Sequence, residues 1–160
     1  MEQKIKCKVQ IIDTKEGIPV FFKVDGDRFR YPYTVKLLSC SEFSVKASFN
    51  RLDEPIQCIR IDGTIIKHKI ISEINDMITE VEFPWYTYQK KVVPNKRRTI
   101  HLVELLFETF AIDFELQVKY YASRSTHLKW GRPLDHVLLE SKNNQHDDDR
   151  KRYKFLAHNY

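Results

Sequence analysis

Histidine, cysteine and serine, three residue types that often carry out chemistry in proteins, occur in this chain without the spacing that a catalytic or metal site requires. No two of the six histidines are separated by two to four residues, the spacing at which a pair can bind one metal ion. Ser39, Cys40 and Ser41 lie together, but no Gly-x-Ser-x-Gly motif surrounds them. With four glycines in the chain, a glycine-rich phosphate loop is also missing. We therefore expect no enzyme activity, no bound metal ion and no cofactor.

The clearest chemical signal is positive charge in residues 89–99. Five basic residues occur there without an acid: Lys90, Lys91, Lys96, Arg97 and Arg98. The whole chain carries a net charge of +5, which suits an acidic peptide, an anionic membrane surface or nucleic acid as a partner. The segment is therefore either the rim of a binding site, a localisation signal, a nucleic-acid contact or an ordinary solvated loop.

Three aromatic residues, Trp85, Tyr86 and Tyr88, come just before this basic segment. They form either an interaction platform or an aromatic cap on the hydrophobic core. We take them, with the five basic residues, as candidate partner-binding residues. A nucleic-acid partner is not expected, because the other aromatic residues mostly occupy inward positions of predicted strands rather than an exposed sheet face.

Length and composition indicate one folded domain. A chain of 160 residues with 42% hydrophobic residues can bury a substantial core. Residues 1–141 are expected to form a β-sandwich domain, and residues 142–160 a polar, partly disordered tail with too little apolar surface to fold. Three cysteines, no signal-peptide pattern and no apolar run of membrane-spanning length favour an intracellular protein with reduced thiols.

Short segments of alternating apolar and polar residues dominate the predicted domain. Examples are residues 4–11, 43–49, 77–83 and 114–121, and a period of two is typical of strands with one buried face. The sequence therefore predicts an all-β fold, an antiparallel sandwich or barrel of about nine or ten strands. Residues 100–111 fit neither period alone, and we expect a strand there that ends in a short helical turn near residues 104–110.

Two Asp-Gly pairs predict tight hairpins of the type I′ class, in which both central residues need positive φ. They are Asp25-Gly26 and Asp62-Gly63, each between runs of β-branched and aromatic residues. Farther along the chain, Trp130-Gly131 is expected to close one end of the barrel, with the Trp130 ring buried and its N–H bonded to a carbonyl. The alternative is that this pair forms the lip of a pocket.

Four blocks in this order resemble the CB1 cannabinoid receptor-interacting protein 1 family. The blocks are residues 22–29, which contain Asp25, Gly26 and Phe29; residues 34–38; residues 117–121; and Trp130-Gly131 with Pro133. The resemblance spans roughly residues 17–142. Each block alone is a weak signal, but the four recur in the order and with spacing similar to that of the family.

The resemblance implies an intracellular all-β protein, similar in fold to the immunoglobulin-like domain of Rho GDP-dissociation inhibitors. It implies a non-enzymatic adaptor that binds the cytoplasmic C-terminal tail of a G-protein-coupled receptor at the inner face of the plasma membrane. Modulation of cannabinoid receptor signalling, including regulation of calcium channels, is part of that expectation. The alternative is a carrier of a lipid or prenyl group, because a sandwich with many inward Phe and Ile residues could open a hydrophobic slot.

Overall fold

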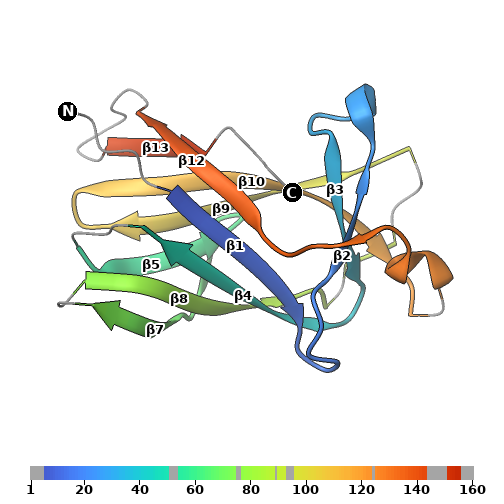
Figure 1. The fold of residues 1–160 in the computed structure, drawn as a ribbon, viewed down its shortest axis with the longest axis horizontal. Helices are drawn as coiled ribbons and strands as arrows, with labels where there is room; N and C mark the ends of the chain where they lie inside the picture. The colour runs from blue at the N-terminus through green and yellow to red at the C-terminus, as the bar shows by residue number, and fades with distance from the viewer. Residues whose placement is uncertain are drawn as a thin grey trace.

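Two β-sheets packed face to face make up the chain in the computed structural model (Figure 1), which describes residues 6–50, 54–74, 77–88, 90–92, 96–123, 125–143 and 151–155. The first sheet has the order β12-β1-β4-β8-β7. Its strands are β1 (Lys6–Asp13), β4 (Glu42–Phe49), β7 (Lys69–Ile74), β8 (Met77–Tyr86) and β12 (Val137–Asn143). All neighbours in this sheet are antiparallel.

The second sheet has the order β11-β2-β3-β10-β9-β5-β6. Its strands are β2 (Phe21–Val24), β3 (Tyr33–Leu38), β5 (Ile56–Ile61), β6 (Thr64–Ile66), β9 (Thr99–Phe107), β10 (Phe110–Tyr121) and β11 (Arg132–Pro133). A last strand, β13 (Lys151–Phe155), joins the sheets by pairing with β10 and β12. The predicted all-β sandwich is confirmed, and the described residues form thirteen strands rather than nine or ten.

β10 is the central strand of the second sheet. Along one edge it pairs with β9, antiparallel. Its other edge is shared, because β13 pairs with residues 110–113 and β3 with residues 118–121, and both of these pairings are parallel. The expectation of purely antiparallel pairing is therefore wrong at these two places. In Figure 1, β2 and β3 lie in the right-hand half of the molecule, and the short 3-10 helix η2 (Thr126–Lys129) lies at its right-hand edge.

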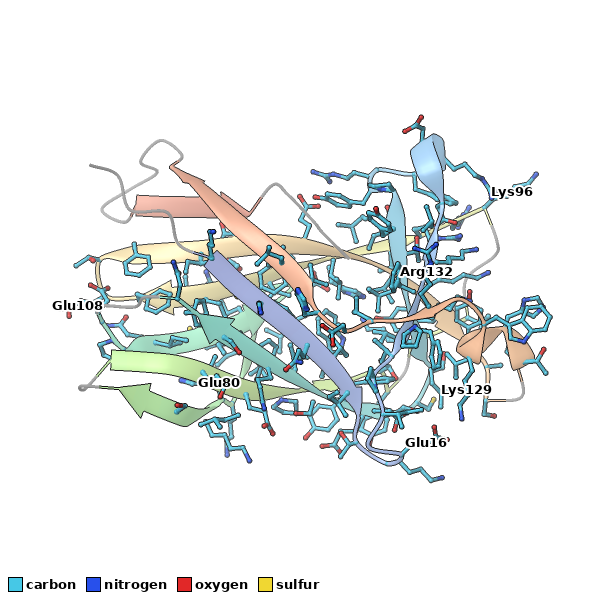
Figure 2. The ribbon with its side chains drawn as sticks, in the orientation of Figure 1. Glu16, Glu80, Lys96, Glu108, Lys129 and Arg132 are labelled. Atoms are coloured by element: carbon cyan, nitrogen blue, oxygen red, sulfur yellow. The ribbon has the colours of Figure 1, made fainter. Side chains whose placement is uncertain are left out.

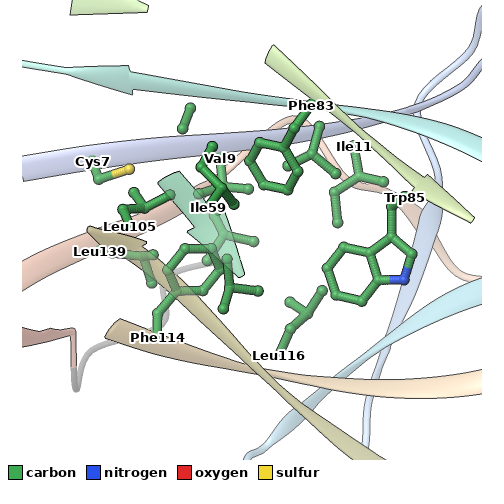
Figure 3. Packing of buried hydrophobic residues seen from close by; sticks show 14 of the residues in the cluster. Cys7, Val9, Ile11, Ile59, Phe83, Trp85, Leu105, Phe114, Leu116 and Leu139 are labelled. Atoms are coloured by element: carbon green, nitrogen blue, oxygen red, sulfur yellow. The ribbon is translucent and has the colours of Figure 1, made fainter. Parts of the chain in front are cut away.

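The hydrophobic core lies between the two sheets. β1 shows the predicted alternation: Cys7, Val9 and Ile11 are buried, and Lys6 and Lys8 face solvent. Figure 3 shows Ile11, Phe83 and Trp85 from the first sheet facing Leu105 and Leu116 from the second. Burying large apolar side chains of this kind is the main contribution to the stability of such a sandwich.

The predicted tail contributes to the sheets in part. β12 continues to Asn143, and Lys151–Phe155 forms β13, while residues 144–150 and 156–160 lie outside the described residues. The division into a domain and a tail stays a prediction, as does the similarity to the Rho GDP-dissociation inhibitor domain. No helix among the described residues is long and apolar enough to cross a membrane.

The two Asp-Gly pairs fold differently. Asp62 and Gly63 have φ of 50° and 84°, and they connect β5 to β6 with Ile61 opposite Thr64, as predicted. At Asp25-Gly26 the type I′ turn is wrong, because only Gly26 has positive φ and residues 26–28 form the 3-10 helix η1 (Gly26–Arg28). The amides of Asp25 and Gly26 both donate to the carbonyl of Pro32, so a longer loop, residues 25–32, connects β2 to β3.

The predicted helical turn near residues 104–110 is also wrong. β9 runs to Phe107 and β10 begins at Phe110, so the segment is a hairpin in which Ala111 faces Leu106. The residues from 103 to 107 are all buried, on both faces of the strand. A strand covered on both faces loses the alternation of apolar and polar residues from which strands are predicted.

A buried histidine of β9, His101, contacts residues of both sheets. Nδ1 of His101 lies 2.6 Å from the Asp62 carboxylate and Nε2 lies 2.6 Å from the Tyr120 hydroxyl. The indole of Trp85 meets the imidazole edge to face, with 5.3 Å between the ring centroids. Burial lowers the pKa of His101 below its ordinary value of 6.5, and the nearby Asp62 carboxylate only partly opposes this.

The lowered pKa of His101 predicts that the protein loses stability in mild acid. Because the pKa of His101 is lower in the folded state than in the unfolded state, the unfolded state binds more protons as the pH falls through 6.5. The free energy of unfolding should therefore not depend on His101 above about pH 6.5. Below that pH it should decrease, by at most about 1.4 kcal/mol per pH unit for this one group. Urea unfolding between pH 7.5 and 5 measures the effect. In H101Q the slope should be smaller, and equal slopes would contradict the assignment.

Candidate ligand-binding pocket

The loop between β2 and β3 is held on the outer face of the second sheet by a buried ion pair. The side chain of Arg98 is only 2% exposed, and its Nε donates to the Asp25 carboxylate at 3.2 Å. Its guanidinium also lies over the Phe29 ring, 4.1 Å from the centroid. Burial alone would raise the pKa of Asp25, but hydrogen bonds from Thr34 and Arg98 and the charge of Arg98 outweigh it and lower that pKa.

Gln117 of β10 completes this network. Its amide donates to the carbonyls of Tyr31 and Tyr33 at 2.9 and 3.1 Å and to the Thr34 hydroxyl at 2.8 Å. Its carbonyl oxygen accepts from the amide of Tyr31 at 3.0 Å. The Asp25, Gly26 and Phe29 motif thus has a structural role: it fixes the loop onto β3 and β10.

Three lysines lie beside this network on the same outer face. Lys36 of β3 and Lys119 of β10 are directly opposite each other in the parallel pairing, and Lys23 of β2 lies opposite Thr34, two residues before Lys36. Lys36 is 4% exposed and Lys119 is 7% exposed. Burial lowers the pKa of both lysines, and the positive charge of Lys23 lowers each further. Like charges placed opposite each other on neighbouring strands repel each other.

Lys36 also positions the segment that covers the sheet. Its ammonium donates to the carbonyl of His127 at 2.8 Å and to the carbonyl of Trp130. These two carbonyls belong to η2 and to the residue that ends it. The lysine therefore ties η2 to β3 and keeps Trp130 at the edge of the pocket described next.

The lysines line a pocket of about 550 Å³, within the size range of small-molecule sites. Among the described residues, five basic side chains and no acid line it: Lys23, Arg28, Lys36, Lys119 and His127. Tyr121, Trp130 and Val92 add apolar surface. Figure 2 shows that Lys96, Lys129 and Arg132 lie at the same end of the molecule, together with Glu16, which pairs with Lys129 at 3.0 Å. The pocket is therefore suited to an anionic group that carries an apolar part.

The eight predicted partner-binding residues differ in whether their side chains are exposed. Trp85 is buried in the core and Arg98 is held by Asp25, so neither side chain is open to a partner in this structure. Tyr86 and Tyr88 are exposed and stacked, with ring centroids 5.5 Å apart.

The other four basic residues of the predicted set, Lys90, Lys91, Lys96 and Arg97, are exposed. Val92, which follows Lys91 in the sequence, lines the pocket. The role of these residues in binding stays a prediction.

The predicted burial of Trp130 is wrong. Its side chain is 56% exposed and packs on His127, with ring centroids 4.0 Å apart. The backbone, rather than the ring, is what the fold uses here: the Trp130 carbonyl binds Lys36, and Gly131, at φ of 108°, approaches the backbone of Phe22. The alternative, that the pair forms the lip of a pocket, matches its position.

The pocket lysines Lys23, Lys36 and Lys119 were not predicted. Each lies between two apolar or aromatic residues of its strand, which ordinarily indicates a position facing solvent. One feature of the sequence could have indicated them: all three lysines fall within the blocks that carry the family resemblance.

A hydrophobic slot for a lipid also stays a prediction. A smaller and more apolar pocket beside Ile18, Phe21 and Leu128 has a volume of about 230 Å³, below the usual range of ligand sites. Between the sheets, the labelled apolar side chains of Figure 3 lie close together.

The fold and the pocket define a β-sandwich protein with a basic, ligand-sized pocket on the outer face of one sheet. The chain belongs to the CB1 cannabinoid receptor-interacting protein 1 family, whose model matches residues 1–151. It is similar to the CB1 cannabinoid receptor-interacting protein 1 of Bos taurus, of Homo sapiens and of Mus musculus. Each is 29% identical over 131 residues, which cover 79% of this chain and 79% of the relative.

Proposed function

We propose that the protein is a non-enzymatic adaptor that binds the cytoplasmic C-terminal tail of a G-protein-coupled receptor of the cannabinoid type 1 class. Its family supports this proposal, since the relatives are named for an interaction with the CB1 receptor. The observation that carries it is the pocket of about 550 Å³ in which two buried lysines and three further basic residues face no acid among the described lining residues.

Electrostatics explain how such a pocket would select a receptor tail. Positive charge steers acidic peptides towards the site and raises the rate of encounter. Inside the pocket, where water is partly excluded, the attraction between lysine and carboxylate is stronger than at an open surface. The neighbouring Trp130 and Val92 offer apolar contacts, which add affinity and distinguish one tail from another.

The cellular role follows from the position of the tail. An adaptor bound there is recruited to the inner face of the plasma membrane by the receptor itself. It changes which signalling proteins reach the receptor, and regulation of calcium channels is the proposed consequence.

Calorimetric titration tests the binding step. The folded protein is titrated with a synthetic peptide of the human CB1 receptor C-terminal tail, and with a peptide of the same composition in scrambled order. We expect saturable binding of the tail alone, and an affinity that falls as salt is raised, because the steering charges are screened. An absence of saturable binding would contradict the proposed function.

A further inference from the structure

We propose that the end of the molecule around the mouth of the basic pocket docks directly on an anionic lipid bilayer. The contact surface, the pocket rim, consists of the exposed residues Arg28, Val92, Lys96, Arg97 and Trp130. Such a contact requires no receptor, so it is independent of the proposed function.

Three residues of the pocket rim stand at the mouth of the pocket. Arg28, Val92 and Trp130 all line it, although they are far apart in the sequence. The side chains of Val92 and Trp130 are 53% and 56% exposed, and Arg28 is exposed as well. A flat partner that covers the mouth would therefore contact all three.

The buried ion pair places the other two residues of the pocket rim near the same loop. Arg98 is bonded to Asp25, which fixes the start of β9 against the loop between β2 and β3. Lys96 and Arg97 directly precede Arg98 and are exposed, and Figure 2 shows Lys96 at this end of the molecule. Two further positive charges therefore extend the surface.

The charges of the pocket rim suit an anionic bilayer. Arg28, Lys96 and Arg97 are basic, and the exposed acid of the loop between β2 and β3 is Asp27. None of the described residues that line the pocket is acidic. Because each basic residue close to an anionic bilayer raises the affinity by about fivefold, the excess of positive charge is sufficient for a measurable attraction.

Trp130 and Val92 supply the apolar part of the contact. Tryptophan favours the interface between membrane and water, because its ring is apolar and its N–H is polar. Apolar area buried in the interface adds to the electrostatic attraction of the basic residues. A bilayer can touch exposed side chains from several separate segments at once, whereas an extended peptide follows one groove. Lys36, which is 4% exposed, cannot reach a flat surface, so the contact does not involve it.

Sedimentation of the wild-type protein with lipid vesicles tests the contact without any receptor peptide. One set of vesicles is phosphatidylcholine alone, and the other contains phosphatidylcholine and phosphatidylserine in equal parts. We expect binding to the mixed vesicles to be at least about tenfold tighter, and to weaken as salt is raised. Equal binding to both sets, or binding to neither, would overturn the inference and leave the proposed function standing. Binding to a polyglutamate peptide but to no vesicle would identify the surface as a site for acidic polypeptides instead.

Tryptophan fluorescence reports the orientation of the bound protein. Trp85 is 4% exposed and Trp130 is 56% exposed, so a change of environment on binding affects Trp130. We expect the emission to shift to shorter wavelength with the mixed vesicles, because the ring of Trp130 leaves water. Binding with an unchanged emission would overturn the placement of Trp130 against the bilayer.

Variants then locate the contact. K96Q/R97Q should weaken binding to the mixed vesicles by about tenfold, because two basic residues leave the surface. The matched control is K6Q/K8Q, which removes the same charge from exposed positions of β1 in the other sheet, and it should bind as the wild type does. Circular dichroism confirms that each variant is folded. The vesicle comparison and the fluorescence need no variant, so the test remains decisive if K96Q/R97Q does not fold. A folded K96Q/R97Q that binds as tightly as the wild type would overturn the assignment to this surface.

Discussion

Replacing Asp25 by alanine should lower the free energy of unfolding by about 3–5 kcal/mol, the usual cost of removing one partner of a buried ion pair. The substitution removes the carboxylate that pairs with the guanidinium of Arg98, whose side chain is 2% exposed. The Thr34 hydroxyl also loses its acceptor. Urea unfolding at neutral pH measures the loss.

The control for this prediction lies two residues away. Asp27 is exposed in η1, so D27A removes the same charge and should change the stability by less than about 0.5 kcal/mol. The double variant D25A/R98M should be more stable than the sum of its single variants predicts, because it removes both buried charges together. A D25A protein as stable as D27A would contradict the role of the ion pair.

Replacing Gly131 by alanine should destabilise the protein by more than about 2 kcal/mol and weaken tail binding with it. A Cβ at this position would lie 2.5 Å from the carbonyl oxygen of Phe22, and φ of 108° is a conformation that alanine rarely adopts. Relieving the contact moves β11 away from β2. It also displaces the carbonyl of Trp130, to which Lys36 donates.

Gly63 separates the two causes of this effect. Its φ of 84° is also positive, but a Cβ there would meet no atom within 4 Å. G63A should therefore show only the conformational cost, about 1 kcal/mol, and leave the pocket unchanged. Thermal unfolding of both variants, with the tail titration repeated on each, checks the prediction. Equal losses in G131A and G63A would argue against the close contact with Phe22.

The parts of the fold that were predictable are those that nearby residues determine. The alternation in residues 43–49 and the Asp62-Gly63 turn specify local backbone structure, and both are observed. The Asp25-Gly26 turn failed because Asp25 is bonded to Thr34 and, from outside the hairpin, to Arg98. Residues 104–110 failed because burial on both faces hides the strand period. In both cases contacts distant in sequence override the local preference.

The pocket could not be predicted for the same reason. Lys36 and Lys119 are neighbours only because β3 pairs in parallel with β10, and no spacing in the sequence reports that pairing. The basic segment that does stand out in the sequence contributes Val92 to the pocket lining and Arg98 to the buried ion pair. The blocks of the family resemblance contain these lysines, but only the pairing of the strands shows that the lysines lie together.

The shared edge of β10 has a consequence for how the chain folds. β3 can complete its pairing only after residues 118–121 are available, so the early strands wait for a segment made some eighty residues later. Sheets that depend on such distant pairings fold slowly, in milliseconds to seconds, because a large loop must close before any contact is gained. A nascent chain that has reached only β9 exposes the edge of β3, and this interval is when the protein is most open to aggregation or to a chaperone.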